Sequence, residues 1–245
     1  MHLTESTWTD VDAVDTDLAA VPVGSTEQHG PHAPLGTDVL TAETVAEAGA
    51  DRYEGEVVVT PAVPVGVAEE HRQFTGTLWV SEDTFRSYVR EVVGSLAHHG
   101  FDRVVLVNGH GGNVPALGEV AGRIVRHDDA YTVPFTWFDE VLDHPSDMGH
   151  GGPVETALLR HAHPELVHED RTDEAADGGS YGWGDWQGST NLAFDSAEFT
   201  DSGVVGDPRE SDADRGEQLL QAAADALVDL LAAIETRDVS RPDHK

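Results

Sequence analysis

The sequence has 245 residues and a strong excess of acidic side chains, with 46 Asp and Glu against 14 Lys and Arg and a formal net charge of −32. This charge excludes proteins that bind nucleic acid through a basic surface, and it disfavours adsorption to anionic lipid. The hydrophobic content of 39% argues against disorder along most of the chain. An acidic excess spread over every segment indicates a halophilic protein that works in concentrated salt, where charge repulsion is screened.

The length fits one large α/β domain, and we expect a single domain over 1–245 with 237–245 as a disordered tail. The absence of cysteine excludes disulfides, thiolate metal sites and cysteine nucleophiles. No apolar run reaches the roughly 18 residues of a membrane helix. Residues 1–10 are polar and acidic and lack the features of a signal peptide. We therefore expect a cytoplasmic protein.

Four apolar, β-branched runs predict strands at 18–23, 57–60, 104–107 and 131–136. Runs that are apolar on both faces are typical of parallel strands covered on both sides. Between and after them, helical spacing predicts helices at 41–53, 81–99, 113–126, 153–161 and 212–236. Alternating strands and helices indicate an α/β fold, with a parallel sheet between two layers of helices.

Residues 165–211 break this alternation, because they are rich in Asp, Gly and Ser. A loop of that length inside a compact domain is either functional or disordered. The aromatic side chains Trp183, Trp186 and Phe194 favour a packed role, as an active-site lid or as a subunit contact.

The densest group of reactive side chains follows the first predicted strand, in the segment GSTEQHGPHAPLGTD at 24–38. Glu27 and His29 are two residues apart and project to the same side of an extended chain. Asp38 follows after a turn rich in Gly and Pro. Two carboxylates and an imidazole are suitable ligands for Zn²⁺, Mn²⁺ or Fe²⁺, and ligands gather at the carboxyl ends of parallel strands.

Two further clusters place a histidine in a glycine-rich turn before a helix. His110 lies in NGHGGN at 108–113, and His150 lies in GHGGPVET at 149–156 with Glu155 five residues on. One histidine in a loop is more often a surface residue than a ligand, but three such clusters predict one site at the rim of the sheet. A phosphate-binding loop is the alternative for these glycine-rich turns, although both lack its lysine and its spacing.

These motifs, together with VPVGSTEQHGPHAPLGTD, GVAEEHRQFTGT and GVVGDPRESDADRGEQLL, resemble the creatininase (creatinine amidohydrolase) family in order and separation. The resemblance extends from about Val21 to Leu231 and suggests a haloarchaeal member. It implies a three-layer α/β/α fold, a binuclear metal centre, hydrolysis of a carbon–nitrogen bond in a small amide, and a homo-oligomer, by resemblance a hexamer.

The resemblance also implies a ligand set. Glu27 and His110 would hold one ion, His29 the other, and Asp38 both. Gly112 stands where creatininase has a glutamate ligand, so Glu155 is the candidate substitute; otherwise the second ion binds weakly or completes its shell with water. Ser146 and Asp147 lie where creatininase has a substrate-bracketing tryptophan, which argues against creatinine as the substrate.

The roles that follow concern proton transfer and substrate contact. His150 is the expected proton donor to the leaving amine with His71 as its substitute, and Glu155, if it is not a ligand, orients His150 or takes the proton of water. The expected substrate contacts are His32, Gly111, Gly112, Trp183 and Trp186. A purely structural role for His32 and a subunit contact for the two tryptophans remain alternatives.

Three functions are compatible with these residues. The first is hydrolysis of a small amide or formamide, including deformylation of a formylaminopyrimidine nucleotide, whose phosphate would need Arg52, Arg72 or Arg103 nearby. The second is a peptidase for a modified peptide of the mycofactocin type. The third is a non-catalytic metal-binding or assembly protein, against which the complete ligand set argues.

Overall fold

The computed structural model of the chain describes residues 1–142 and 148–242, so Ser146, Asp147 and the last three residues of the expected tail lie outside the described residues. The main sheet has four parallel strands in the order β2-β1-β3-β4. Its strands are β1 (Leu18–Val23), β2 (Val58–Val59), β3 (Arg103–Asn108) and β4 (Tyr131–Thr136). Within the described ranges, no helix is both long and apolar enough to cross a membrane.

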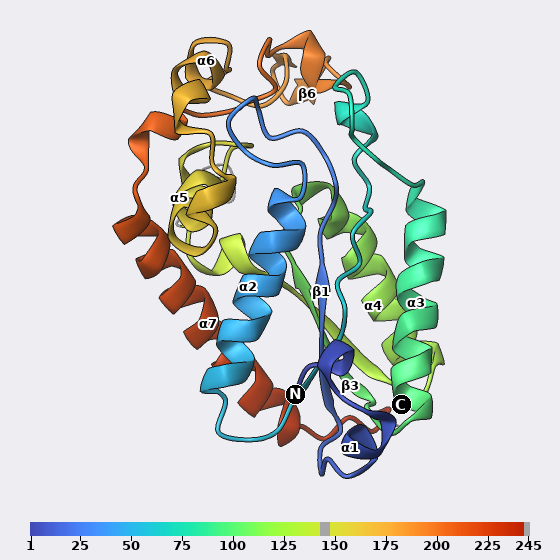
Figure 1. Ribbon diagram of the computed structural model, residues 1–245. Coiled ribbons are helices and arrows are strands. Elements are labelled where there is room, and N and C mark those ends of the chain that lie inside the picture. Colours follow the sequence, from blue (N-terminus) through green and yellow to red (C-terminus); the bar gives the residue numbers. More distant parts are fainter. Residues whose placement is uncertain (143–147, 243–245) are drawn as a thin grey trace.

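Helices cover both faces of the sheet, which confirms the α/β fold (Figure 1). On one face α2 (Thr37–Arg52), α5 (Pro153–Ala162) and α7 (Ala213–Glu235) pack together. Their apolar side chains share one buried cluster with β1, β3 and β4. On the other face α3 (Glu82–His98) and α4 (Val114–His127) share a second buried cluster with residues of β1, β2 and β3. The central strands β1 and β3 are therefore buried on both faces, whereas the edge strand β4 leaves Pro134 exposed.

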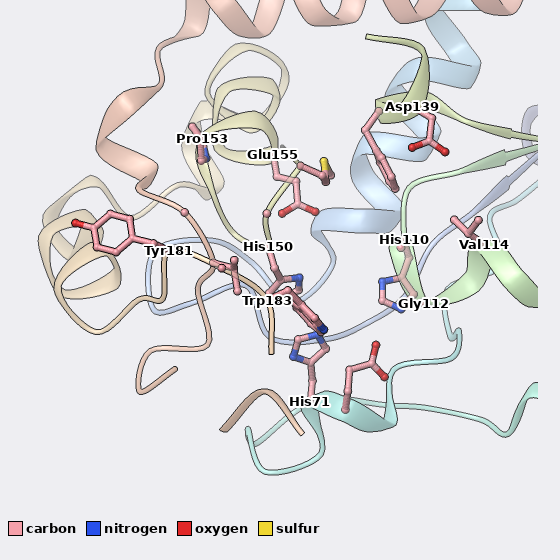
Figure 2. Close-up of a pocket in the computed structure, with 18 of the residues that line it drawn as sticks. His71, His110, Gly112, Val114, Asp139, His150, Pro153, Glu155, Tyr181 and Trp183 are labelled. Carbon is pink, nitrogen blue, oxygen red and sulfur yellow. The ribbon is translucent and has the colours of Figure 1, made fainter. Parts of the chain in front are cut away.

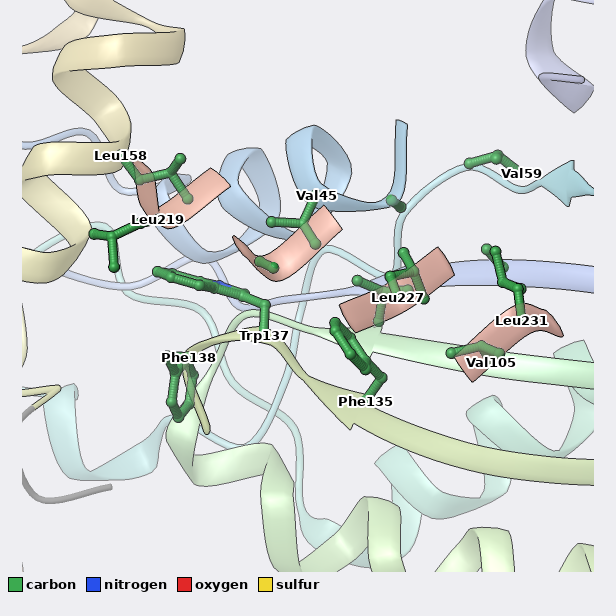
Figure 3. Close-up of a cluster of buried hydrophobic side chains, with 14 of the residues drawn as sticks. Val45, Val59, Val105, Phe135, Trp137, Phe138, Leu158, Leu219, Leu227 and Leu231 are labelled. Atoms are coloured by element: carbon green, nitrogen blue, oxygen red, sulfur yellow. The ribbon is translucent and has the colours of Figure 1, made fainter. Parts of the chain in front are cut away.

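Trp137, directly after β4, is the largest fully buried side chain of the α2–α5–α7 face. Figure 3 shows it between Leu219 of α7 and Phe135 of β4. The leucine stripe predicted on the last helix faces this cluster, with Leu227 and Leu231 nearly inaccessible to solvent. Burying such side chains contributes about 1.5–3 kcal/mol each.

The predicted strands and helices agree with the structure to within one residue at each end, except that α2 begins at Thr37 instead of residue 41. The short helix α1 (Trp8–Asp12) was not predicted. The Thr37 hydroxyl donates to the Pro34 carbonyl, so the turn leads directly into the helix. Asp38 consequently lies in the first helical turn, where the helix dipole favours a carboxylate. At α3 the predicted cap is present, because the Ser81 side chain accepts from the backbone of Thr84.

The segment 165–211 is more ordered than its composition indicates. It contains α6 (Thr172–Asp177), several 3₁₀ turns and a hairpin of β5 (Trp186–Gln187) and β6 (Thr190–Asn191). Trp186 and Phe194 are 57% and 85% exposed and do not pack within the chain, so the subunit contact stays a prediction for them. Residues 237–242 have no regular secondary structure, although Arg241 donates to the Asp128 carbonyl.

Candidate metal centre

The side chains expected at the metal site converge at one rim of the sheet. The cause is strand register: Val23, the last residue of β1, pairs with Asn108, the last residue of β3. Both strands therefore end at the same level, and the segments that follow them meet there, as ligand-binding segments do in open parallel sheets. The turn into α5 reaches the same place. The converging residues are Glu27, His29, Asp38, His110, His150 and Glu155.

Asp38 lies at the centre of this cluster, with one carboxylate oxygen toward each of two histidines. Its Oδ1 lies 3.0 Å from His29 Nε2, and its Oδ2 lies 3.3 Å from His110 Nδ1. Glu27 Oε1 lies 3.2 Å from His110 Nδ1, and Glu155 Oε1 lies 3.3 Å from His29 Nε2. Two ligand groups result. The first is Glu27–Asp38–His110, and the second is His29 with its carboxylate neighbours Asp38 and Glu155, where His150 is also close enough to His29 and Glu155 to bind an ion.

His71 and His150 stack beside the two groups, with ring centroids 4.2 Å apart. His71 Nε2 lies 3.5 Å and His150 Nδ1 3.7 Å from Glu27 Oε1. Burial lowers the pKa of His71 to about 3 and the pKa of His150 well below its usual value, so both rings are neutral near pH 7.

Backbone carbonyls orient three of the four imidazoles. A carbonyl oxygen only accepts hydrogen bonds, so the ring nitrogen that faces it carries the proton of the neutral imidazole. The opposite nitrogen then presents its lone pair to the carboxylates, which is the arrangement of a histidine that binds a metal. The donating nitrogens are His29 Nδ1 to Glu27 O (3.2 Å), His110 Nε2 to Val67 O (2.7 Å) and His150 Nε2 to Gln28 O (2.5 Å).

Burial perturbs the pKa values of the cluster. Burial raises the pKa of Glu27 to about 7, although His110 opposes the shift. Burial would also raise the pKa of Asp38, but His29 and His110 outweigh it and lower this pKa to about 2. Burial disfavours protonation of both histidines, yet the carboxylates raise their pKa well above the usual value. The carboxylates thus require positive charge between them, which divalent cations supply by displacing protons.

The residues present fit such cations. Both carboxylate oxygens of Glu27, His29 Nε2 and Asp38 Oδ2 are buried without a hydrogen-bond partner among the described residues. Leaving a buried polar atom without a partner costs about 1–3 kcal/mol, and these atoms face one another. In the Glu27–Asp38–His110 group the ligand atoms all lie within 4.8 Å of one another. Carboxylate oxygen and imidazole nitrogen suit Zn²⁺, Mn²⁺ and Fe²⁺.

A cavity of about 1010 Å³ opens onto the cluster. Figure 2 shows His71, His110 and His150 directed toward a common space, with Trp183 over His71 and Glu155 on the far side. Apolar side chains such as Val114 and Pro153 also line the wall, together with the carboxylates of Glu70, Asp139, Asp207 and Glu210. The cavity therefore combines apolar and acidic surface around the histidines.

Three of the five expected substrate contacts line this cavity, namely Gly111, Gly112 and Trp183. His32 is not among the lining residues: its ring is fully buried, its Nε2 lies 2.9 Å from Thr156 Oγ1, and burial lowers its pKa to about 4. Trp186 is also absent from the wall, because its exposed indole donates to the Trp183 carbonyl. His32 is thus a buried residue outside the cavity lining, and Trp186 is an exposed residue outside it.

The backbone around Gly112 leaves no room for a ligand side chain. A Cβ at this position would overlap the Val67 carbonyl and crowd His110 Nε2. Those two atoms form the hydrogen bond that orients His110. Glu155 instead reaches His29 from the first turn of α5, and the Gly151 amide donates to its Oε2 at 2.6 Å.

The sequence did not single out Gln28, although it lies between two candidate ligands in the motif. Its side-chain amide lies 2.9 Å from His71 Nδ1 and 2.9 Å from the Gly203 carbonyl, which belongs to a segment 175 residues away. Only the position between Glu27 and His29 could have drawn attention to it. Asp139, which also lines the cavity, gave no signal because one more aspartate is unremarkable in so acidic a sequence.

Comparison with known proteins agrees with the motifs. A match to the creatininase family, described as creatinine amidohydrolase, covers residues 4–231. The chain belongs to the creatininase family. It is accordingly a member of a family of amidohydrolases, enzymes that act on carbon–nitrogen bonds.

Two curated relatives differ in what their names say they act on. The mycofactocin precursor peptide peptidase of Mycolicibacterium smegmatis is 33% identical over 218 residues, which cover 86% of this chain and 83% of the relative. The creatinine amidohydrolase of Pseudomonas putida is 31% identical over 193 residues, which cover 68% and 74%. A solved structure titled creatininase Mn superposes with a TM-score of 0.82 at 25% identity, covering 96% of this chain and 99% of that one.

Proposed function

We propose that the chain hydrolyses a carbon–nitrogen amide bond with two divalent ions, Zn²⁺, Mn²⁺ or Fe²⁺. The observation that carries the proposal is Asp38, whose two oxygens face two separate ligand groups at the floor of a cavity. Glu27 and His110 would complete one site, and His29 and Glu155 the other. Such ions supply an activated water and polarise the amide oxygen when they are bound.

The protein must also move a proton. Hydrolysis forms a bond between the carbonyl carbon and the oxygen of water and breaks the carbon–nitrogen bond, so the leaving nitrogen has to gain a proton. His71 and His150 are the neutral groups beside the ligands that line the cavity, and Trp183 covers them with ring centroids 5.7 and 6.1 Å away. This cover restricts water at the position where the proton is transferred.

The charge of the cavity wall favours a neutral or cationic substrate. Glu70, Asp139 and Glu210 line the wall, whereas no arginine or lysine does among the described residues. The three arginines considered for a phosphate are engaged elsewhere: Arg52 with Asp225, Arg72 with Glu69 and Asp195, and Arg103 with Asp17. A nucleotide phosphate would therefore be repelled, and amides or formamides without phosphate are the better candidates.

A peptide is the second candidate substrate. The cavity volume of about 1010 Å³ lies at the upper end of the range for small-molecule sites, about 300–1,000 Å³, and far exceeds what a small cyclic amide fills. The relative named as a peptidase aligns over more of the chain than the creatinine amidohydrolase does. Both observations favour an amide bond within a short peptide.

A substrate panel tests the proposal. The protein loaded with Zn²⁺ or Mn²⁺ is incubated with N-formyl amines, creatinine, a formylaminopyrimidine nucleotide and short peptides, and released formate or amine is measured. Hydrolysis of any non-phosphorylated amide that is lost in Asp38→Asn and kept in Asp139→Asn supports it. A protein that binds two ions and turns over none of these amides would contradict it and favour the non-catalytic metal-binding protein.

A further inference from the structure

The orientation of His71 differs from that of the other three histidines of the cluster. Those three place a ring nitrogen against a backbone carbonyl, but the outer nitrogen of His71, Nδ1, lies 2.9 Å from the side-chain amide nitrogen of Gln28. The Ser196 hydroxyl lies 2.9 Å from the same Nδ1 and also reaches the Glu70 carbonyl. The hydroxyl has a single proton, which it donates either to the Glu70 carbonyl or to His71 Nδ1, so it does not fix the tautomer of His71. The Gln28 amide nitrogen can only donate, and it therefore decides the tautomer.

Two backbone groups fix the orientation of the Gln28 amide. The Gly30 amide donates to Gln28 Oε1 at 2.9 Å, and Gln28 Nε2 donates to the Gly203 carbonyl at 2.9 Å. Rotating the amide by 180° would break both hydrogen bonds and oppose two oxygens. The site is also tightly closed: Gln28 is 5% exposed, and a Cβ at Gly203, where φ is +85°, would overlap its amide. The second proton of Nε2 therefore points at His71.

It follows that His71 Nδ1 accepts a hydrogen bond and that the neutral ring carries its proton on Nε2. Among the described residues this Nε2 has no hydrogen-bond partner, and it lies 3.5 Å from Glu27 Oε1, on the cavity side. The backbone of the same Gln28 does the opposite to His150, because its carbonyl accepts from His150 Nε2 and leaves Nδ1 with a lone pair. Gln28 thus contacts both stacked rings: its side-chain N–H donates to His71, and its backbone carbonyl accepts from His150.

We propose that Gln28 is a positioning residue that holds both imidazoles in the Nε2–H tautomer with opposite nitrogens toward the metal cluster, so that His71 presents an N–H donor and His150 a lone pair to it. One consequence rests on the proposed function: the His150 Nδ1 lone pair takes a proton from the attacking water and returns it to the leaving nitrogen, whereas His71 Nε2 only donates a hydrogen bond. A second is independent of it. The Glu27–His71–His150 group, although close enough for a metal, is not a third ion site, because the His71 nitrogen that faces it is protonated.

Nitrogen-15 spectroscopy of the zinc-loaded protein tests the proposal directly, because protonated and unprotonated ring nitrogens have distinct shifts and Zn²⁺ is diamagnetic. The signals are assigned with His71→Gln and His150→Gln. We expect His71 to be protonated at Nε2 and His150 at Nε2, with both Nδ1 atoms unprotonated. Wild-type His71 with its proton on Nδ1 would overturn the proposal without any variant and without any assay of activity.

Two variants separate Gln28 from its neighbours. Gln28→Glu keeps the acceptor for Gly30 but replaces the donor by an acceptor, so we expect the His71 proton to move to Nδ1. Ser196→Ala removes the other group at the same nitrogen, and we expect the wild-type tautomer. A shift in Ser196→Ala but not in Gln28→Glu would refute the role of Gln28. If Gln28→Glu does not fold, Gln28→Met, which removes the donor, should still yield a mixture of tautomers.

On an amide that the wild type hydrolyses, Gln28→Glu should lower kcat about 10–100-fold with little change in KM, as loss of a hydrogen-bond partner that orients a site histidine does. An unchanged kcat together with a shifted tautomer would show that turnover does not need the His71 N–H, while leaving the positioning role intact. Absence of turnover by the wild type would contradict the proposed function only, since the nitrogen-15 result does not depend on it.

Discussion

Replacement of Glu155 by glutamine tests whether this residue completes the second metal site in place of a ligand at position 112. In the structure Glu155 Oε1 lies 3.3 Å from His29 Nε2, and the Gly151 amide donates to Oε2. Glutamine has nearly the same shape and its carbonyl oxygen can keep the Gly151 hydrogen bond. The atom that faces His29 then becomes an uncharged amide nitrogen, which has no lone pair for a metal.

The expected loss of affinity follows from burial. Glu155 is 3% exposed, and His29 and Asp38 are buried still more completely, so solvent cannot replace the lost charge. Removing one partner from a buried charge pair typically costs about 3–5 kcal/mol. At 1.4 kcal/mol per tenfold, this lowers the affinity of the second ion by roughly 10² to 10³·⁵. The Glu27–Asp38–His110 group is unchanged, so the affinity of the first ion should stay within a few-fold.

Calorimetric titration with Zn²⁺ measures both affinities, and elemental analysis after desalting gives the stoichiometry. We expect two ions in the wild type and one in Glu155→Gln. Asp139→Asn is the matched control, because it removes one carboxylate from the same cavity outside both ligand groups. Two tightly bound ions in Glu155→Gln would refute the assignment of Glu155 as a ligand.

Four further outcomes follow. Since burial lowers the pKa of His32 to about 4 from 6.5, its contribution to stability is present above pH 6.5 and is lost as the pH falls to 4; denaturant unfolding should show a loss of about 3 kcal/mol relative to His32→Gln, and parallel pH profiles would contradict this. Gly112→Ala should displace His110 and weaken zinc binding at least tenfold by the same titration, whereas wild-type affinity would show that the backbone can adjust. A net charge of −32 should make the melting temperature rise steeply between millimolar and molar KCl, and an unchanged curve would exclude salt adaptation. If the exposed aromatic side chains of segment 165–211 form the expected subunit contact, Phe194→Asp should lower the mass measured by light scattering; an unchanged mass would place the contact elsewhere.

Most of the fold could be predicted because its signals are local. Strands that are apolar on both faces, such as 103–108, and a helix with the Ser81 cap are set by neighbouring residues. The early start of α2 was missed because the sequence GTD is equally typical of a turn, and its helical state depends on hydrogen bonds such as Leu40 N–H to the Gly36 carbonyl and the Thr37 hydroxyl to the Pro34 carbonyl. The hairpin at 186–191 was missed because its two strands are short and polar.

The candidate site likewise has one part that local sequence signals predict and another part that they do not. Glycine-rich motifs identify Glu27, His110 and their neighbours, and strand register then brings them together. The sequence does not predict which ring nitrogen of a histidine faces the cavity, because hydrogen bonds between residues far apart in the chain determine it. The contact of Gln28 with the Gly203 carbonyl joins residues 175 positions apart and has no local signature. The sequence therefore predicts which side chains meet, whereas their hydrogen-bonding roles require the structure.

The most direct measurement of the central claim is an anomalous difference map from crystals of the zinc-loaded protein. The two-metal account predicts two peaks on either side of the Asp38 carboxylate, one beside Glu27 and His110 and the other beside His29 and Glu155. A single peak, or a peak between Glu27, His71 and His150, would contradict it.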